Sequence, residues 1–296
     1  MLYLHIGSEK TASTAIQVFL RKNSKILNRY GYLTPRKNPY LQANLLSTPF
    51  GLESDAPEAL GIRNYQKTAS KVLCNLARFL STPGENLVLS SEFLQARLKT
   101  HAQLEALRDF VKGYVDKTTI IYYTREPWAK ALSLLCESIK GGTGKLELES
   151  LLRDEFYHSC SINRVPQMWK DVFENAKIVK YEDAIAETGG ICGSFLRSIN
   201  CHALANKLLK ASSFQPYNAR ISVSQALCLQ KINSALPSLT SNRRIDGVAR
   251  RRILDLSLKA SRLVLTKEPK FFDTYFSEKD KQLWLSTFEL VDKAVR

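Results

Sequence analysis

The stretch MLYLHIGSEKTAST, residues 1–14, decides the fold predicted for this chain. Its first six residues form a short apolar run that is typical of a buried strand, and the run breaks at Gly7. From Thr14 the apolar residues take helical spacing, which predicts a helix through about Arg29. A strand, a tight turn that contains Lys10 and a helix together present free backbone N–H groups and a positive helix end to a phosphate-like anion.

The turn alone leaves two interpretations open. It is not a Walker A loop, because that motif needs a glycine directly before the lysine and Glu9 stands there. The alternative to anion binding is an ordinary strand-to-helix turn whose serine and threonine residues cap the helix.

Three further apolar runs predict strands downstream, at residues 87–91, 118–124 and 176–181. Helical periodicity separates them, at about 66–80, 102–115, 127–141 and 165–173. Residues 36–60 are expected to form a long surface excursion, and past Ile185 only helical or loop patterns occur. Strands that alternate with helices predict an open parallel α/β sheet.

The polar residues that follow three of these strands form a candidate site. In an open parallel sheet ligands bind at the carboxyl ends of the strands. Residues 7–14, Glu92 and Arg125 each stand at such an end. The sequence therefore predicts that they lie within reach of one site.

Composition indicates a soluble globular protein with anionic partners. Its 296 residues carry a formal net charge of +15, which raises the local concentration of anions without identifying them. No apolar run reaches about eighteen residues, so no membrane span is expected, although peripheral membrane contact is left open. No signal peptide precedes the first strand, so a cytoplasmic location is expected if Met1 is the native start. The four histidines lack metal-ligand spacing and the six cysteines are scattered, so we expect no metal site and reduced thiols.

A second motif, downstream of the Lys10 turn, favours the anion-binding interpretation of that turn. The segment REPWAKALS, residues 125–133, follows the clearest strand in the chain. With the Lys10 turn it resembles sulfotransferases that use 3′-phosphoadenosine 5′-phosphosulfate, in which a later Arg-x-x-x-x-Arg-x-x-Ser motif holds the 3′-phosphate. The opening HIGxxKTxST, residues 5–14, is especially similar to bacterial members that modify carbohydrates.

This resemblance implies a three-layer P-loop-type open parallel sheet flanked by helices, with a mostly helical C-terminal third. It also implies one domain over 1–296, with a sheet-bearing core to about residue 200 and a helical extension over 201–296 packed on it. The expected activity is sulfuryl transfer from that nucleotide to a hydroxyl of a glycan or a related acceptor, without a metal and without a nucleic acid partner.

The resemblance assigns the site residues as follows. Lys10 neutralises the leaving oxygen, and the amides of residues 11–14 hold the 5′-phosphate. The contacts to the nucleotide are implied for Lys10, Thr11, Ala12, Ser13, Thr14, Arg125 and Ser133. Two departures from the family pattern are Ala12 in place of the usual glycine, which makes the backbone less free, and Lys130 in place of the second arginine, which loses the bidentate fork.

The reaction also needs a base for the acceptor hydroxyl, and Glu92 is predicted to supply it. Its segment, LSSEFL at 89–94, resembles the place where heparan-type sulfotransferases carry a catalytic glutamate. The alternative is a carboxylate at a helix start that interacts with the helix dipole. His5 is expected to be a structural strand residue.

Other functions remain open from the sequence. One is a P-loop kinase, which would need a Mg²⁺-binding carboxylate that the sequence does not reveal. Another is a non-catalytic RNA- or polyanion-binding module driven by the charge. The basic stretch 243–262 is interpreted mainly as a solvated face, and Asn218 and Arg220 are candidates for the adenosine site.

Overall fold

The protein is described by a computed structural model, which covers residues 1–35, 38–41, 45–51, 64–84, 86–141, 144–208, 226–227, 229–231 and 275–293. These residues divide into two compact units. The first takes the described residues of 1–125 and 161–217, and the second those of 126–160 and 218–296. Each unit is described by itself.

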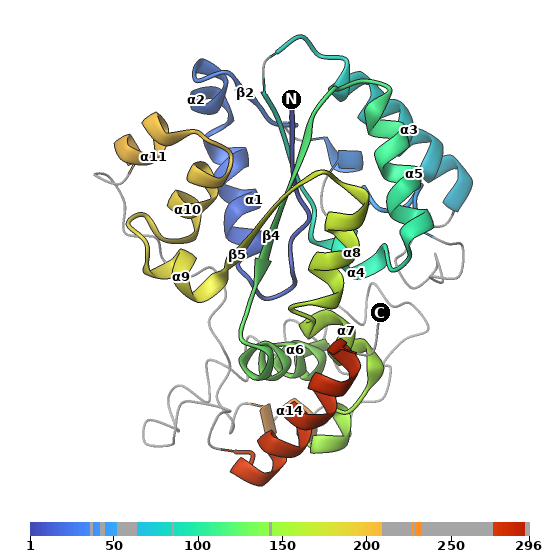
Figure 1. The fold of residues 1–296 in the computed structure, drawn as a ribbon, viewed down its shortest axis with the longest axis vertical. Coiled ribbons are helices and arrows are strands. Elements are labelled where there is room, and N and C mark those ends of the chain that lie inside the picture. Colours follow the sequence, from blue (N-terminus) through green and yellow to red (C-terminus); the bar gives the residue numbers. More distant parts are fainter. Residues whose placement is uncertain are drawn as a thin grey trace. The chain divides into compact units, whose positions relative to one another are not determined.

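The first unit contains a five-stranded, fully parallel sheet with the order β2-β3-β1-β4-β5 (Figure 1). The strands are β1 (Leu2–His5), β2 (Tyr32–Leu33), β3 (Asn86–Ser90), β4 (Thr118–Thr124) and β5 (Asn175–Lys180). β1 lies at the centre, between β3 and β4. β2 and β3 lie on one side of β1, and the later strands β4 and β5 lie on the other side. In open parallel sheets a ligand binds where the strand order reverses in this way, which here is the carboxyl end of β1.

Helices cover both faces of this sheet, which confirms the predicted three-layer α/β class. On one face Leu2, Leu4 and Ile6 of the first strand and its extension pack with α3, α4, α5 and α8. On the other face Tyr3, which alternates with them, packs with α1, α2, α10 and α11. Their bounds are α1 (Ser13–Lys22), α2 (Ser24–Arg29), α3 (Tyr65–Leu80), α4 (Glu92–Arg97), α5 (His101–Lys112), α8 (Arg164–Val172), α10 (Gly190–Ser198) and α11 (His202–Leu208).

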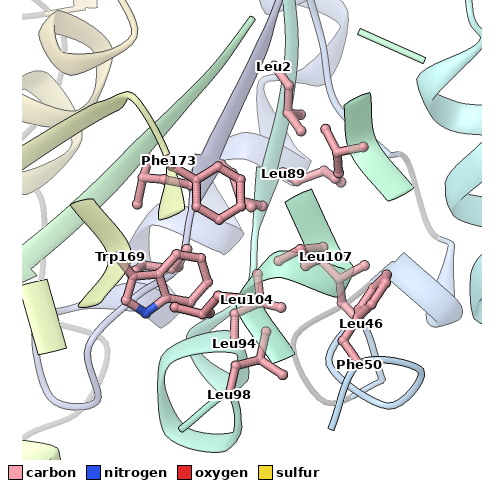
Figure 2. Close-up of a cluster of buried hydrophobic side chains, with 14 of the residues drawn as sticks. Leu2, Leu46, Phe50, Leu89, Leu94, Leu98, Leu104, Leu107, Trp169 and Phe173 are labelled. Atoms are coloured by element: carbon pink, nitrogen blue, oxygen red, sulfur yellow. The ribbon is translucent and has the colours of Figure 1, made fainter. Parts of the chain in front are cut away.

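Figure 2 shows how the first of these cores fixes α4. Leu94 of α4 and Leu98, which directly follows that helix, are fully buried in the same cluster as Leu104 of α5 and Trp169 of α8. Burying one such leucine contributes about 1.5–3 kcal/mol. The short α4 therefore holds its position through its apolar face, and Glu92 is its first residue.

Two expectations need correction. The helix expected over 14–29 is two helices, because Asn23 separates α1 from α2 and both its backbone and its side-chain N–H groups donate to the Phe19 carbonyl. The excursion expected at 36–60 is not wholly a surface feature. Among its described residues, Leu41 at the end of the 3-10 turn η1 (Pro39–Leu41), Leu46 and Phe50 are buried in the first core.

The second unit is helical in its described part. It contains α6 (Pro127–Gly141), the 3-10 turn η3 (Leu148–Ser150), α7 (Asp154–Cys160) and α14 (Glu278–Lys293). Its core contains aromatic contacts: the Trp284 ring stacks on Phe288 with a centroid distance of 5.2 Å, and the Trp284 indole N–H donates to the Leu151 carbonyl at 2.9 Å. This unit therefore has a hydrophobic core of its own.

Candidate functional site

The loop between β1 and α1 has a backbone that repeatedly turns into the left-handed region. The φ angles are +71° at Gly7, +63° at Lys10 and +63° at Ala12. Left-handed residues among right-handed ones point successive N–H groups toward one concave side, which is the geometry of an anion-binding nest. The sequence predicted a tight turn here, although it did not predict that two residues with a Cβ would take left-handed angles.

Ser8 holds this loop closed through its carbonyl oxygen. That oxygen accepts hydrogen bonds from the Thr11 N–H at 3.3 Å, the Thr11 hydroxyl at 2.6 Å and the Ser13 hydroxyl at 3.2 Å. Both hydroxyl residues are buried, whereas Thr14 is exposed. Thr11 and Ser13 therefore brace the turn from inside.

The start of α1 carries neither a side-chain cap nor an acidic residue. Ala12 is its N-cap and makes no side-chain capping bond, and the first turn contains no acidic residue. The first N–H groups of a helix have no intrahelical carbonyl partner, and the aligned peptide dipoles give this end a partial positive charge. The N-cap residue is an alanine, so it has no side-chain group that could cap the helix.

Glu92 lies directly against this loop. β1 and β3 pair with His5 opposite Ser90, and the Ser91 N–H donates to the His5 carbonyl at 2.9 Å. A Cβ atom on Gly7 would lie 2.5 Å from the Glu92 Cα and 2.7 Å from its Cβ. Only glycine fits so close an approach, so Gly7 is what allows the Glu92 backbone to reach the loop.

Arg125 reaches the loop from the other side of β1. It follows β4, and its Nη1 donates a hydrogen bond of 2.7 Å to the carbonyl oxygen of Lys10. The guanidinium carbon lies 5.1 Å from the centre of the Tyr181 ring, which follows β5. A guanidinium over an aromatic face is held by a cation–π attraction.

Tyr181 is a residue that the sequence interpretation placed at a strand end without giving it a role. α9 (Tyr181–Ala186) begins with it, and its side chain is half-buried. The available signal was an aromatic residue at the carboxyl end of a strand, at the sheet edge where Arg125 also lies. β4 and β5 are neighbours with Thr124 opposite Lys180.

His5 is structural, as expected. It is fully buried, its Nδ1 lies 2.7 Å from the Ser90 hydroxyl, and its ring makes edge contacts with Tyr123 and Phe195. Burial lowers the pKa of His5 to about 3, because the charged imidazolium loses its hydration there. The ring is therefore neutral near pH 7.

The remaining members of the second motif belong to the second unit. Ser133 is half-buried on α6. The Glu126 carboxylate caps that helix by accepting the Ala129 N–H at 2.6 Å and the Trp128 N–H at 3.2 Å. Lys130 is buried, and its ammonium donates to the Ser159 carbonyl on α7.

Some predictions lie outside the described residues, namely those for Asn218, Arg220 and the basic stretch 243–262. Within the described part of the chain, no helix is both long enough and apolar enough to span a bilayer. The same part contains no group of three or more His, Cys, Asp or Glu side chains arranged to hold a metal ion.

The fold and the site together define a parallel α/β protein in which the Lys10 loop, Glu92 and Arg125 meet at the end of the central strand β1. Neither a protein-family model nor a curated protein sequence matches the chain. Among solved structures, the chain is similar to a sulfotransferase from Alicyclobacillus acidocaldarius, at 15% identity and a TM-score of 0.44 over 88% of this chain and 98% of that one.

It is also similar to the sulfotransferase domain from the curacin biosynthetic pathway, at 13% identity and a TM-score of 0.39 over 98% of this chain and 97% of that one. A likeness at these values assigns neither a family nor an activity. The functional conclusion therefore rests on the residues of this chain.

Proposed function

We propose that this protein transfers a sulfuryl group from 3′-phosphoadenosine 5′-phosphosulfate to a hydroxyl of a carbohydrate or a related acceptor. The observation that carries the proposal is the meeting of three strand ends. The Lys10 loop follows β1, Glu92 lies against Gly7 of that loop, and Arg125 donates to the Lys10 carbonyl. A cation, a carboxylate and a second cation around an anion loop are the groups that this transfer needs.

The loop suits the phosphosulfate in charge and shape. Left-handed residues, an uncapped helix start and the Lys10 ammonium all favour a negative group. The absence of a Cβ at Gly7 lets the Glu92 Cα and Cβ pack against the loop, and the Glu92 carboxylate is proposed to act beside it. Preorganised donors of this kind stabilise charge that develops during a reaction.

When bound, the nucleotide supplies an activated sulfuryl group, whose bond from sulfur to the bridging oxygen breaks as the acceptor oxygen bonds to sulfur. Lys10 is proposed to neutralise the negative charge that the bridging oxygen gains with the electron pair of the broken bond. Glu92 is proposed to take the proton that the acceptor hydroxyl loses. Atoms and charge then balance without a metal being required.

Arg125 and Ser133 are proposed to hold the 3′-phosphate. A guanidinium offers five N–H donors in a planar fork that matches a phosphate, and a serine hydroxyl adds one more donor. This contact would distinguish the nucleotide from AMP and from ATP, which carry no 3′-phosphate.

A thermal-shift measurement tests the proposal. At equal concentrations and without Mg²⁺, 3′,5′-bisphosphoadenosine should raise the melting temperature well above the value with AMP, because a ligand that binds only the native state stabilises it by mass action. Equal shifts for the two nucleotides would contradict the 3′-phosphate assignment. A larger shift with ATP and Mg²⁺ would favour the kinase alternative.

A further inference from the structure

We propose that Arg125 has a second task besides holding the 3′-phosphate, namely to position the loop that carries Lys10. This inference rests on the proposed function for the identity of the nucleotide, but the contact that carries it is a property of the protein alone. The Arg125 Nη1 donates to the backbone carbonyl of Lys10, at 2.7 Å.

The bonded carbonyl belongs to a residue in a costly conformation. Lys10 has a φ of +63°, which is unfavourable for a residue with a Cβ and persists only where its surroundings hold it. Ser8 braces the loop on one side of Lys10 through the bonds from Thr11 and Ser13. Arg125 holds the carbonyl end of the peptide group between Lys10 and Thr11, while the N–H of the same peptide group donates to Ser8.

The guanidinium is itself held in place. Arg125 is half-buried, and its guanidinium carbon lies 5.1 Å from the centre of the Tyr181 ring. Tyr181 stands at the end of β5 and Arg125 at the end of the neighbouring β4. Two rigid strands therefore present the donor that fixes the Lys10 peptide group.

This arrangement couples the two phosphate sites of the nucleotide. One bond to the Lys10 carbonyl does not exclude a bond to phosphate, because a guanidinium has five donors. A 3′-phosphate that engages Arg125 also holds the Lys10 loop in its present shape. A donor that lacks the 3′-phosphate should therefore be turned over more slowly at saturation, besides being bound more weakly.

The test compares Arg125→Met with the matched variant Arg78→Met. Methionine keeps the length of the apolar stem and removes every donor, and Arg78 is an exposed arginine on α3. Calorimetric titration with AMP, which has no 3′-phosphate, measures the affinity that the Lys10 loop provides without any contribution from the 3′-phosphate contact. Arg125→Met should weaken AMP binding about tenfold or more, as expected for a lost hydrogen bond from a charged group, and Arg78→Met should leave it unchanged.

Hydrogen exchange of the ligand-free protein gives an independent readout. The Thr11 N–H donates to Ser8, and the Ala15 and Ile16 N–H groups donate to Ala12. In Arg125→Met these amides should exchange about tenfold faster or more, while peptides from β1 and β4 keep their protection. Tyr181→Leu should shift the same amides in the same direction by a smaller factor.

The outcomes separate the two proposals. If Arg125→Met weakens only 3′,5′-bisphosphoadenosine, with AMP affinity and loop exchange unchanged, Arg125 is a phosphate ligand alone and the positioning role is wrong. If the wild-type protein fails to prefer the bisphosphate over AMP, the proposed function fails, and the exchange rates still decide whether Arg125 positions the loop. Loss of protection throughout the sheet would also overturn the inference, because it would show a general structural role.

Discussion

The backbone of Glu92 lies so close to Gly7 that a Cβ atom at residue 7 would be 2.5 Å from the Glu92 Cα. The two residues follow neighbouring parallel strands, whose register places His5 opposite Ser90. The position of the proposed base relative to the Lys10 loop therefore depends on Gly7, which contributes no reactive group of its own.

Gly7→Ala tests this packing. The substitution adds a Cβ in the left-handed region and forces it into the Glu92 backbone, so the free energy of unfolding should fall by roughly 2–4 kcal/mol. Nucleotide binding should be lost with it. Urea unfolding and calorimetric titration measure the two effects.

Gly190→Ala is the matched control for that variant. Gly190 also has a left-handed φ, +56°, but a Cβ there would meet no heavy atom within 4 Å. Its loss of stability should be limited to about 1–2 kcal/mol, with nucleotide binding intact. Equal losses of stability for the two variants would show that the left-handed backbone conformation alone, without the contact to Glu92, accounts for the effect of Gly7→Ala.

Ala12→Gly should stabilise the protein. Ala12 has a φ of +63°, where an alanine pays a steric penalty that glycine avoids. After the larger entropy of an unfolded glycine is subtracted, a gain of about 0.5–1 kcal/mol is expected. Ala15→Gly, three residues on inside α1, should instead lose about 1 kcal/mol. A loss for Ala12→Gly in urea unfolding would mean that residue 12 is not strained.

Lys10→Ala and Glu92→Gln separate catalysis from binding. Both groups are proposed to act on charges that develop during transfer, so turnover should fall more than affinity for 3′,5′-bisphosphoadenosine. Removal of a positioned base lowers the rate by about a hundredfold to ten-thousandfold. The readouts are sulfate transfer from the donor, or its slow hydrolysis without an acceptor, beside calorimetric affinity. Near-normal turnover by Glu92→Gln on its true acceptor would remove Glu92 from the mechanism.

His5 should make the protein sensitive to acid. In the folded state its pKa is about 3, whereas an unfolded histidine has a pKa of about 6.5. Below about pH 6.5 the His5 ring is protonated in the unfolded chain but stays neutral in the folded chain. The free energy of unfolding therefore falls by about 1.4 kcal/mol for each pH unit of acidification, until the pH nears 3. Urea unfolding between about pH 4.5 and about pH 7.5 measures the slope.

His5→Leu should flatten that slope, because it removes the buried titrating group. His101→Gln removes an exposed imidazole that pairs with Asp171 and is the control. If His5→Leu keeps the wild-type slope, the acid sensitivity arises elsewhere in the chain.

The repeating pattern of the chain made its architecture predictable. β4 has the predicted bounds of 118–124, because its seven consecutive residues are β-branched or aromatic, and α6 has the predicted bounds of 127–141, with Pro127 as its first residue. The break at Asn23 was not predictable from apolar spacing, since the residues on either side keep the same helical period. It depends on a side-chain amide that bonds Phe19.

The internal arrangement of the candidate site was less predictable from the sequence. Sequence order placed Lys10, Glu92 and Arg125 at strand ends, but it could not give the bond between Arg125 and the Lys10 carbonyl, which joins residues 115 positions apart. Nor could it give the inward direction of the Thr11 and Ser13 hydroxyls, because residue type alone does not say whether a hydroxyl faces a ligand or its own backbone. Both depend on tertiary packing.

The burial of Lys130 has a consequence for redesign of the second motif. Lys130 stands where the motif that the sequence resembles has its second arginine, yet its ammonium bonds the Ser159 carbonyl where α6 contacts α7. Lys130→Arg would restore the arginine of that motif while placing a larger, planar group at a buried position, and overpacking of that kind destabilises by about 1–3 kcal/mol. Engineering that aims at tighter nucleotide binding should therefore leave residue 130 alone and vary the half-buried positions around Arg125.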